Sequence, residues 1–104
     1  MKLNKHVCVV GAGYWGQNHI RTLYELDALG GVVEKNADVL VDIKNIYPNI
    51  ATFSSLSDAI LMRNFAGFVV ATPAESHFDI AMEIIRAGFH VLVEKPVSLT
   101  VDDV

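Results

Sequence analysis

The chain has a single cysteine, Cys8, and no long apolar run. One cysteine cannot form an intrachain disulfide, and Cys8 stands in a short apolar stretch, where a small buried hydrophobic side chain explains it better than a redox role. No stretch approaches the roughly 18 apolar residues of a membrane span, and glycines interrupt the first apolar run. We therefore expect no membrane partner, no secretory signal and a reducing, cytoplasmic setting.

Basic residues are also scarce. Eight lysines and arginines stand against 12 acidic residues, for a net charge of −4, and they form no basic cluster, so nucleic acid is not expected as a partner. The four histidines are scattered, without the spacing of a metal-binding motif. We expect no metal site.

What the chain does have is an apolar run broken by three glycines, from His6 to Gly16, HVCVVGAGYWG. Residues 7–10 predict a strand buried on both faces, because no polar residue alternates among them. After it, Gly11 permits a tight turn, Gly13 lets a pyrophosphate approach the backbone, and Gly16 lets the next helix pack close to the strand. The N-terminus of that helix would face the phosphate.

The surroundings of this motif favour cofactor binding over a purely structural turn. A helix that begins near Trp15 is followed by a second apolar run, 29–33, and then by Glu34. Glu34 lies 18 positions after Gly16, near the spacing of roughly 20 residues at which an acidic side chain reaches the adenosine ribose 2′-OH. The sequence therefore predicts NAD as the cofactor, with NADP less favoured because its 2′-phosphate would face the Glu34 carboxylate.

Strands and helices alternate through the rest of the chain. Helices are predicted over 36–47, 55–62 and 72–88, and strands over 51–53, 67–71 and 90–94. This alternation predicts βαβ crossovers and hence an α/β fold with a doubly wound parallel, Rossmann-like sheet. Ligand is expected at the carboxyl ends of the strands, where residues 11–16, 71–75 and 94–96 should converge.

The helix that opens at Thr72 and Pro73 has the clearest amphipathic pattern. Its predicted buried stripe is Phe78, Ala81, Met82 and Ile85. Gly88 is placed to cap its C-terminus.

One domain is expected over residues 1–104. Residues 100–103, TVDD, have the pattern of a helix N-terminus, just before the sequence stops. Taken alone, this pattern leaves two readings open, a truncated domain and a frayed polar tail.

Four motifs, in this order, resemble those of the Gfo/Idh/MocA oxidoreductases, which act mostly on sugars, cyclitols and related alcohols. They are Gly11-x-Gly13-x-x-Gly16-x-x-His19, Glu34 after the second strand, Ala71-Thr72-Pro73 with His77, and Ala87-Gly88-x-His90-Val91-x-x-Glu94-Lys95-Pro96. In addition, Gly13-Tyr14-Trp15-Gly16-x-Asn18 is similar to members that oxidise nucleotide sugars.

This resemblance implies a domain that binds NAD or NADP, followed in full-length members by an α/β domain with the substrate site and the oligomer interface. That second domain is absent here, which favours the truncated reading. The implied partners are a sugar or nucleotide-sugar substrate of the full-length enzyme and further copies of the same protein.

The resemblance also assigns site residues. Lys95 matches the catalytic lysine, whose ammonium would lie beside the substrate hydroxyl and stabilise the developing alkoxide. Glu94 matches a position near the nicotinamide ribose, and Pro96 shapes the loop.

Two other cofactor-site assignments have alternatives. Ala71, Thr72 and Pro73 match a loop that runs along the cofactor, although Thr72-Pro73 would look the same as a plain helix cap. Tyr14 and Trp15 either contact cofactor or substrate or fill the gap between domains.

The expected function is therefore the cofactor-binding domain of an NAD-dependent dehydrogenase, inactive in isolation. Two alternatives from other classes are a stand-alone dinucleotide sensor without catalysis and a methyltransferase that binds S-adenosylmethionine at the same glycine loop. The Glu94-Lys95-Pro96 motif has no role in a methyltransferase.

Overall fold

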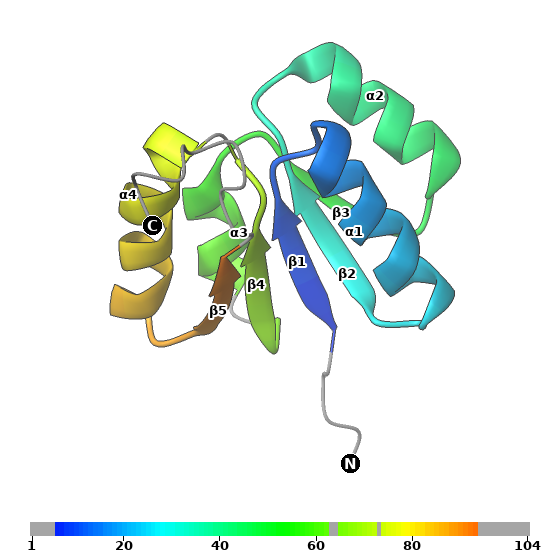
Figure 1. Cartoon of the computed structure of the whole chain (residues 1–104). Coiled ribbons are helices and arrows are strands. Elements are labelled where there is room, and N and C mark those ends of the chain that lie inside the picture. The colour runs from blue at the N-terminus through cyan, green and yellow to red at the C-terminus, as the bar shows by residue number, and fades with distance from the viewer. Residues whose placement is uncertain (1–5, 63–64, 73, 94–104) are drawn as a thin grey trace, which may run out of the picture.

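The computed structural model describes residues 6–62, 65–72 and 74–93, which alternate between strands and helices (Figure 1). In chain order the elements are β1 Val7–Val10, α1 Tyr14–Glu25, β2 Leu29–Val33, α2 Ala37–Ile46, β3 Ala51–Phe53, α3 Leu56–Met62, β4 Gly67–Val70, α4 Ala74–Arg86 and β5 His90–Val93. Every strand and helix predicted in this part of the chain is present, with small differences at the ends.

The five strands form one parallel sheet in the order β3-β2-β1-β4-β5. The chain starts in the middle strand, builds outward to β3, crosses to β4 and builds outward again to β5. This is a doubly wound sheet, which confirms the predicted Rossmann-like fold. The strand order reverses between β1 and β4, so the carboxyl ends of these two strands form the edge where such folds bind ligands.

Helices cover both faces of the sheet, over two separate apolar clusters. On one face, α3 and α4 pack over a cluster of buried residues, Cys8, Val10, Val33, Ala59, Phe65, Phe68, Val70 and Ile84. On the other, α1 and α2 pack over Val9, Ala12, Ile20, Leu29, Val32, Ile43, Ile50 and Val69. Cys8 has no exposed surface, and loss of hydration raises the pKa of its thiol to about 12, as expected for a structural cysteine.

The end of α4 has the predicted glycine cap. Gly88 has a φ of +93°, in the region that favours glycine. Its N–H donates to the Ile85 carbonyl oxygen at 2.9 Å, and the N–H of Phe89 donates to the Ile84 carbonyl oxygen at 3.3 Å. These two bonds satisfy two of the last carbonyl groups of α4 as the chain turns into β5.

The predicted buried face of α4 was wrong in part. Phe78 is 72% exposed and Ile85 51% exposed, whereas Ala81 and Ile84 are buried and Met82 is half-buried. The observed buried stripe is rotated by one residue, about 100° around the helix axis. Because α4 is apolar on more than one side, helical periodicity fits both stripes, and packing against β4 and β5 selects the one that includes Ile84.

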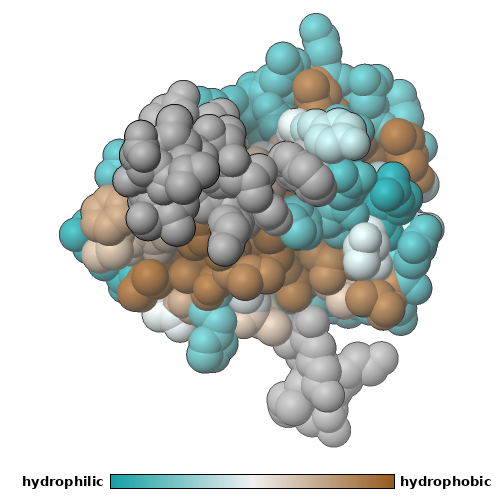
Figure 2. All heavy atoms as spheres, viewed as in Figure 1, coloured by the Kyte–Doolittle hydropathy of each residue, from teal (hydrophilic) through white to brown (hydrophobic). Residues whose placement is uncertain are grey.

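The strand β5 lies at the edge of the sheet and is largely exposed. Leu92 is paired in register with Val69, so it points to the same face as α1, and it is 63% exposed. Figure 2 shows apolar side chains gathered on this face over β4 and β5. Within the described ranges, no helix has the length and apolar character needed to cross a membrane.

Candidate functional site

The turn between β1 and α1 is built by its glycines. Gly11 has a φ of +100°, and its N–H donates to the Val33 carbonyl oxygen at 2.8 Å. A Cβ on Gly16 would overlap the Gly11 carbonyl oxygen, so glycine is required for α1 to begin this close to β1. A Cβ on Gly13 would meet no atom within 4 Å, which leaves the loop surface open at that residue. The geometry of Gly11 and Gly16 matches their predicted roles in the tight turn and in the close packing of α1, and the role of Gly13 at a pyrophosphate stays a prediction.

The segment after β4 lies beside this turn. A Cβ on Gly11 would lie 3.0 Å from Thr72 Cγ2 and 3.1 Å from the Ala71 carbonyl oxygen. The N–H of Ala71 donates to the Val10 carbonyl oxygen at 2.8 Å, which continues the pairing of β1 with β4. Two of the three stretches predicted to converge are therefore adjacent, at the edge where the strand order reverses.

Glu34 follows β2, and its carboxylate reaches the glycine turn. Oε1 accepts a hydrogen bond from the N–H of Ala12 at 2.7 Å, and Oε2 accepts one from the N–H of Asn36 at 2.9 Å. Asn36 in turn caps α2, because its Oδ1 accepts from the N–H groups of Asp38 and Val39 at 2.9 and 3.2 Å. The acidic side chain is thus fixed at the mouth of the turn, where Rossmann-like folds place an adenosine ribose.

The groups at this edge fit a dinucleotide. The N-cap of α1 is Gly13, which makes no side-chain cap, and the first turn of α1 has no acidic residue, so the positive end of the helix suits a phosphate. The Thr72 hydroxyl is buried and has no hydrogen-bond partner within the described part of the chain. A bound ligand with polar groups would satisfy this hydroxyl, which makes no helix-capping bond of its own.

The other predicted site residues are placed only in part. Tyr14 begins α1 and is 78% exposed, so it is accessible from solvent at the open side of the turn. The remaining predicted positions lie outside the described residues: the side chain of Trp15, Pro73, Glu94, Lys95 and Pro96. Among residues 6–62, 65–72 and 74–93, no group of three histidine, cysteine or acidic side chains is arranged to hold a metal ion.

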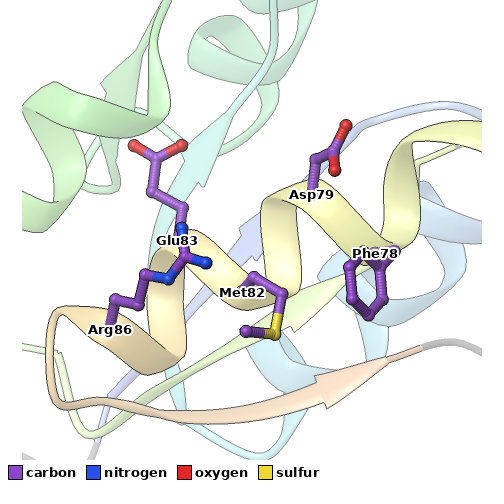
Figure 3. Close-up of a pocket in the computed structure, with 5 residues that line it drawn as sticks. All are labelled: Phe78, Asp79, Met82, Glu83 and Arg86. Carbon is purple, nitrogen blue, oxygen red and sulfur yellow. The ribbon is translucent and has the colours of Figure 1, made fainter.

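A surface hollow elsewhere does not compete with this site. Its described lining residues all belong to α4, namely Phe78, Asp79, Met82, Glu83 and Arg86 (Figure 3). Phe78 and Met82 project from one side of the helix and Asp79 and Glu83 from another. These side chains diverge along one helix, whereas the groups around the glycine turn come from three different strand ends.

The doubly wound sheet, the glycine turn and the acidic residue fixed after β2 together define a dinucleotide-binding α/β domain. More specifically, residues 5–104 match the Gfo/Idh/MocA family, described as an oxidoreductase family with an NAD-binding Rossmann fold. The chain belongs to this family. Membership rules out the methyltransferase alternative.

Known relatives include sugar-modifying enzymes. UDP-N-acetylglucosamine 3-dehydrogenase of Acidithiobacillus ferrooxidans is 26% identical over 100 residues, which cover 91% of this chain and 29% of that enzyme. Among solved structures, GenD2 from gentamicin A biosynthesis, in complex with NAD, is 34% identical with a TM-score of 0.82, over 93% of this chain and 28% of that one. The WlbA dehydrogenase of Bordetella pertussis, in complex with NADH and UDP-GlcNAcA, is 32% identical with a TM-score of 0.80, over 88% and 29%.

The chain thus spans about three tenths of the length of these relatives. This similarity supports the predicted fold and the predicted binding of NAD.

Sequence reasoning missed one contact at the site. The side-chain Nε2 of Gln17, in the first turns of α1, donates to the Ala12 carbonyl oxygen at 2.9 Å. Together with the Glu34 bond to the Ala12 N–H, it holds both polar backbone groups of Ala12. Nothing in the spacing of Gln17 indicates this role, because it depends on how closely the turn approaches α1.

Proposed function

We propose that residues 1–104 form the dinucleotide-binding domain of a longer NAD-dependent oxidoreductase that acts on a hydroxyl group of a sugar or nucleotide sugar. NAD, when bound, supplies the acceptor for the hydride that leaves the substrate carbon. The open backbone at Gly13 and the N-terminus of α1 would hold the pyrophosphate, and Glu34 would accept a hydrogen bond from the ribose 2′-OH. Lys95 would stabilise the substrate alkoxide.

The observation that carries this proposal is the position of Glu34. Its carboxylate is fixed beside the glycine turn by two backbone N–H groups, so it cannot swing away to admit a 2′-phosphate without breaking both bonds. A phosphate there would meet a like charge, which the neighbouring exposed Lys35 only partly offsets. The sugar or nucleotide-sugar substrate is supported by the relatives that carry such names.

Cofactor preference is tested by calorimetric titration of the chain with NADH and with NADPH. We expect NADH to bind about tenfold more tightly, equivalent to roughly 1.4 kcal/mol. Replacing Glu34 by serine should remove most of this difference, because the repelling carboxylate is gone. Equal or tighter binding of NADPH by the unaltered chain would contradict the proposal.

A stand-alone dinucleotide sensor is the remaining alternative. Both functions require cofactor binding, so titration does not separate them. Turnover assays on the complete natural protein, with several nucleotide sugars and polyols, separate the two functions. Oxidation coupled to NADH formation supports the enzyme. Cofactor binding without turnover supports the sensor.

A further inference from the structure

The two polar backbone groups of Ala12 are both held by side chains from outside the glycine turn. Its N–H donates to Glu34 Oε1 at 2.7 Å, and its carbonyl oxygen accepts from Gln17 Nε2 at 2.9 Å. The residue as a whole is 1% exposed and belongs to the apolar cluster beneath α1 and α2. Ala12 is therefore fixed on three sides.

Ala12 also stands between two of the glycines of the turn. It lies between Gly11, with its φ of +100°, and Gly13, where a Cβ would meet no neighbouring atom. Glycines on both sides allow the backbone many conformations. Without the two side-chain bonds, the turn would have to be ordered by the ligand, and that ordering would weaken binding.

We propose that Glu34 and Gln17 are positioning residues that hold the Ala12 backbone and so preform the dinucleotide-binding turn. Glu34 then acts on binding in two ways, through the ribose hydroxyl and through the turn. Gln17 acts through the turn alone. This inference deepens the proposed function and rests on it for the identity of the ligand.

The chemistry of the contacts explains why a carboxylate suits position 34. Two N–H donors, from Ala12 and Asn36, meet the two oxygens of one side chain. In Glu34→Gln, the amide has the same shape but only one acceptor oxygen and one NH₂ group. The NH₂ group is a donor, so it cannot accept the hydrogen bond from one of the two backbone N–H groups. One bond is lost even when no cofactor is present.

The test compares two ligands, NADH and an analogue whose adenosine ribose lacks the 2′- and 3′-hydroxyl groups. Affinities are measured for the unaltered chain, Glu34→Gln and Gln17→Met. Matched controls are Glu25→Gln, the same charge change at the far end of α1, and Thr22→Met on the exposed surface of α1. Far-UV circular dichroism and thermal unfolding verify that each variant is folded.

We expect both site variants to bind the deoxygenated analogue about fivefold more weakly than the unaltered chain does, the scale of one hydrogen bond. Controls should stay within about twofold. If Glu34→Gln weakens NADH but leaves the analogue unchanged, Glu34 acts through the ribose alone; the inference is then overturned, while the proposed function stands.

Hydrogen exchange of the Ala12 amide, measured by NMR without ligand, gives an independent reading. The amide should be protected in the unaltered chain and should exchange about fivefold faster or more in Glu34→Gln, with the control Glu25→Gln unchanged. An unprotected Ala12 amide in the unaltered chain would overturn the inference. If the chain bound neither dinucleotide, the proposed function would fail, and this exchange measurement would still decide whether Glu34 holds the turn.

Discussion

Among the single residues that the structure describes, Cys8 has a side chain whose chemistry is changed by burial. Its side chain projects from β1 into the apolar cluster under α3 and α4 and is wholly buried there. Burial raises the pKa of the thiol from 9.0 to about 12. The folded state therefore holds the proton more tightly than the unfolded chain does. Below pH 9 this difference has no effect on stability, because the thiol is protonated in both states.

We predict that this thiol contributes to alkaline unfolding. As pH rises from 9 toward 12, the unfolded state gains a thiolate that the folded state cannot form, so the free energy of unfolding should fall by about 1.4 kcal/mol per pH unit from this group. Urea unfolding of the unaltered chain and of Cys8→Ala between pH 8 and 11 measures the difference. The variant should lose stability less steeply, whereas Val9→Ala, buried to the same extent, should keep the original slope. Parallel slopes for the unaltered chain and Cys8→Ala would disprove the effect.

The proposed catalytic role of Lys95 is tested in the complete natural protein. We expect Lys95→Ala to lower kcat by roughly 10² to 10⁴, the usual scale for a positioned acid–base group, with little change in cofactor affinity. Steady-state kinetics and NADH titration give the two quantities. Lys35→Ala, a lysine beside the ribose-binding position, serves as the control and should leave kcat close to its original value. Normal turnover by Lys95→Ala would remove Lys95 from the mechanism.

Among the secondary-structure elements, β2 has two glycines where a side chain would crowd the ring of Phe65. A Cβ on Gly31 would lie 2.9 Å from Phe65 Cζ, and one on Gly30 would lie 3.1 Å from Phe65 Cε1. The Phe65 ring is itself held in edge contacts with Phe53 and Phe68, at centroid distances of 6.0 and 5.7 Å. The ring therefore has little room to withdraw.

From this packing we predict that Gly31→Ala destabilises the fold by about 1 to 3 kcal/mol, the usual cost of overpacking a core. Denaturant unfolding measures the loss. In a Phe65→Leu background, which removes the ring edge, the same substitution should cost clearly less. An equal cost in both backgrounds would show that the ring contact is not the cause.

The sequence was sufficient for the elements whose signals are local. Unbroken apolar runs predicted β1, β4 and β5, and the glycine spacing predicted the turn after β1. The buried face of α4 was not predictable from periodicity, because Phe78 and Ile84 belong to two apolar stripes of the same helix and only the sheet selects between them. The hold on Ala12 by Gln17 was not predictable either, since it is set by the close approach of two backbones.

At the scale of the whole molecule, the exposed apolar surface along β5 is the main feature of the described residues. Leu92 on β5 is 63% exposed, and Figure 2 shows apolar side chains gathered over β4 and β5. Exposed apolar area of this kind on an edge strand favours association with other chains. A homo-oligomer is consistent with this surface and remains a proposal.

We predict that the chain self-associates at high concentration and binds dyes that report apolar surface. Leu92→Lys should reduce both, because it places a charge in the middle of the exposed strand. Light scattering over a concentration series and dye fluorescence measure the two effects. Thr22→Lys, on the exposed surface of α1, is the matched control and should change neither. A chain that stays monomeric at high concentration and binds no dye would refute the prediction.

The bond between Glu34 and Ala12 also bears on redesign of the cofactor preference. An engineer who replaces Glu34 to admit a 2′-phosphate removes the acceptor for the Ala12 N–H and for the Asn36 N–H in the same step. In a library that varies position 34 alone, most variants would therefore bind the cofactor weakly because the glycine turn is disordered, not because they recognise the phosphate poorly. Positions that can offer a substitute acceptor to Ala12 should be randomised first, and the cation for the phosphate introduced afterwards.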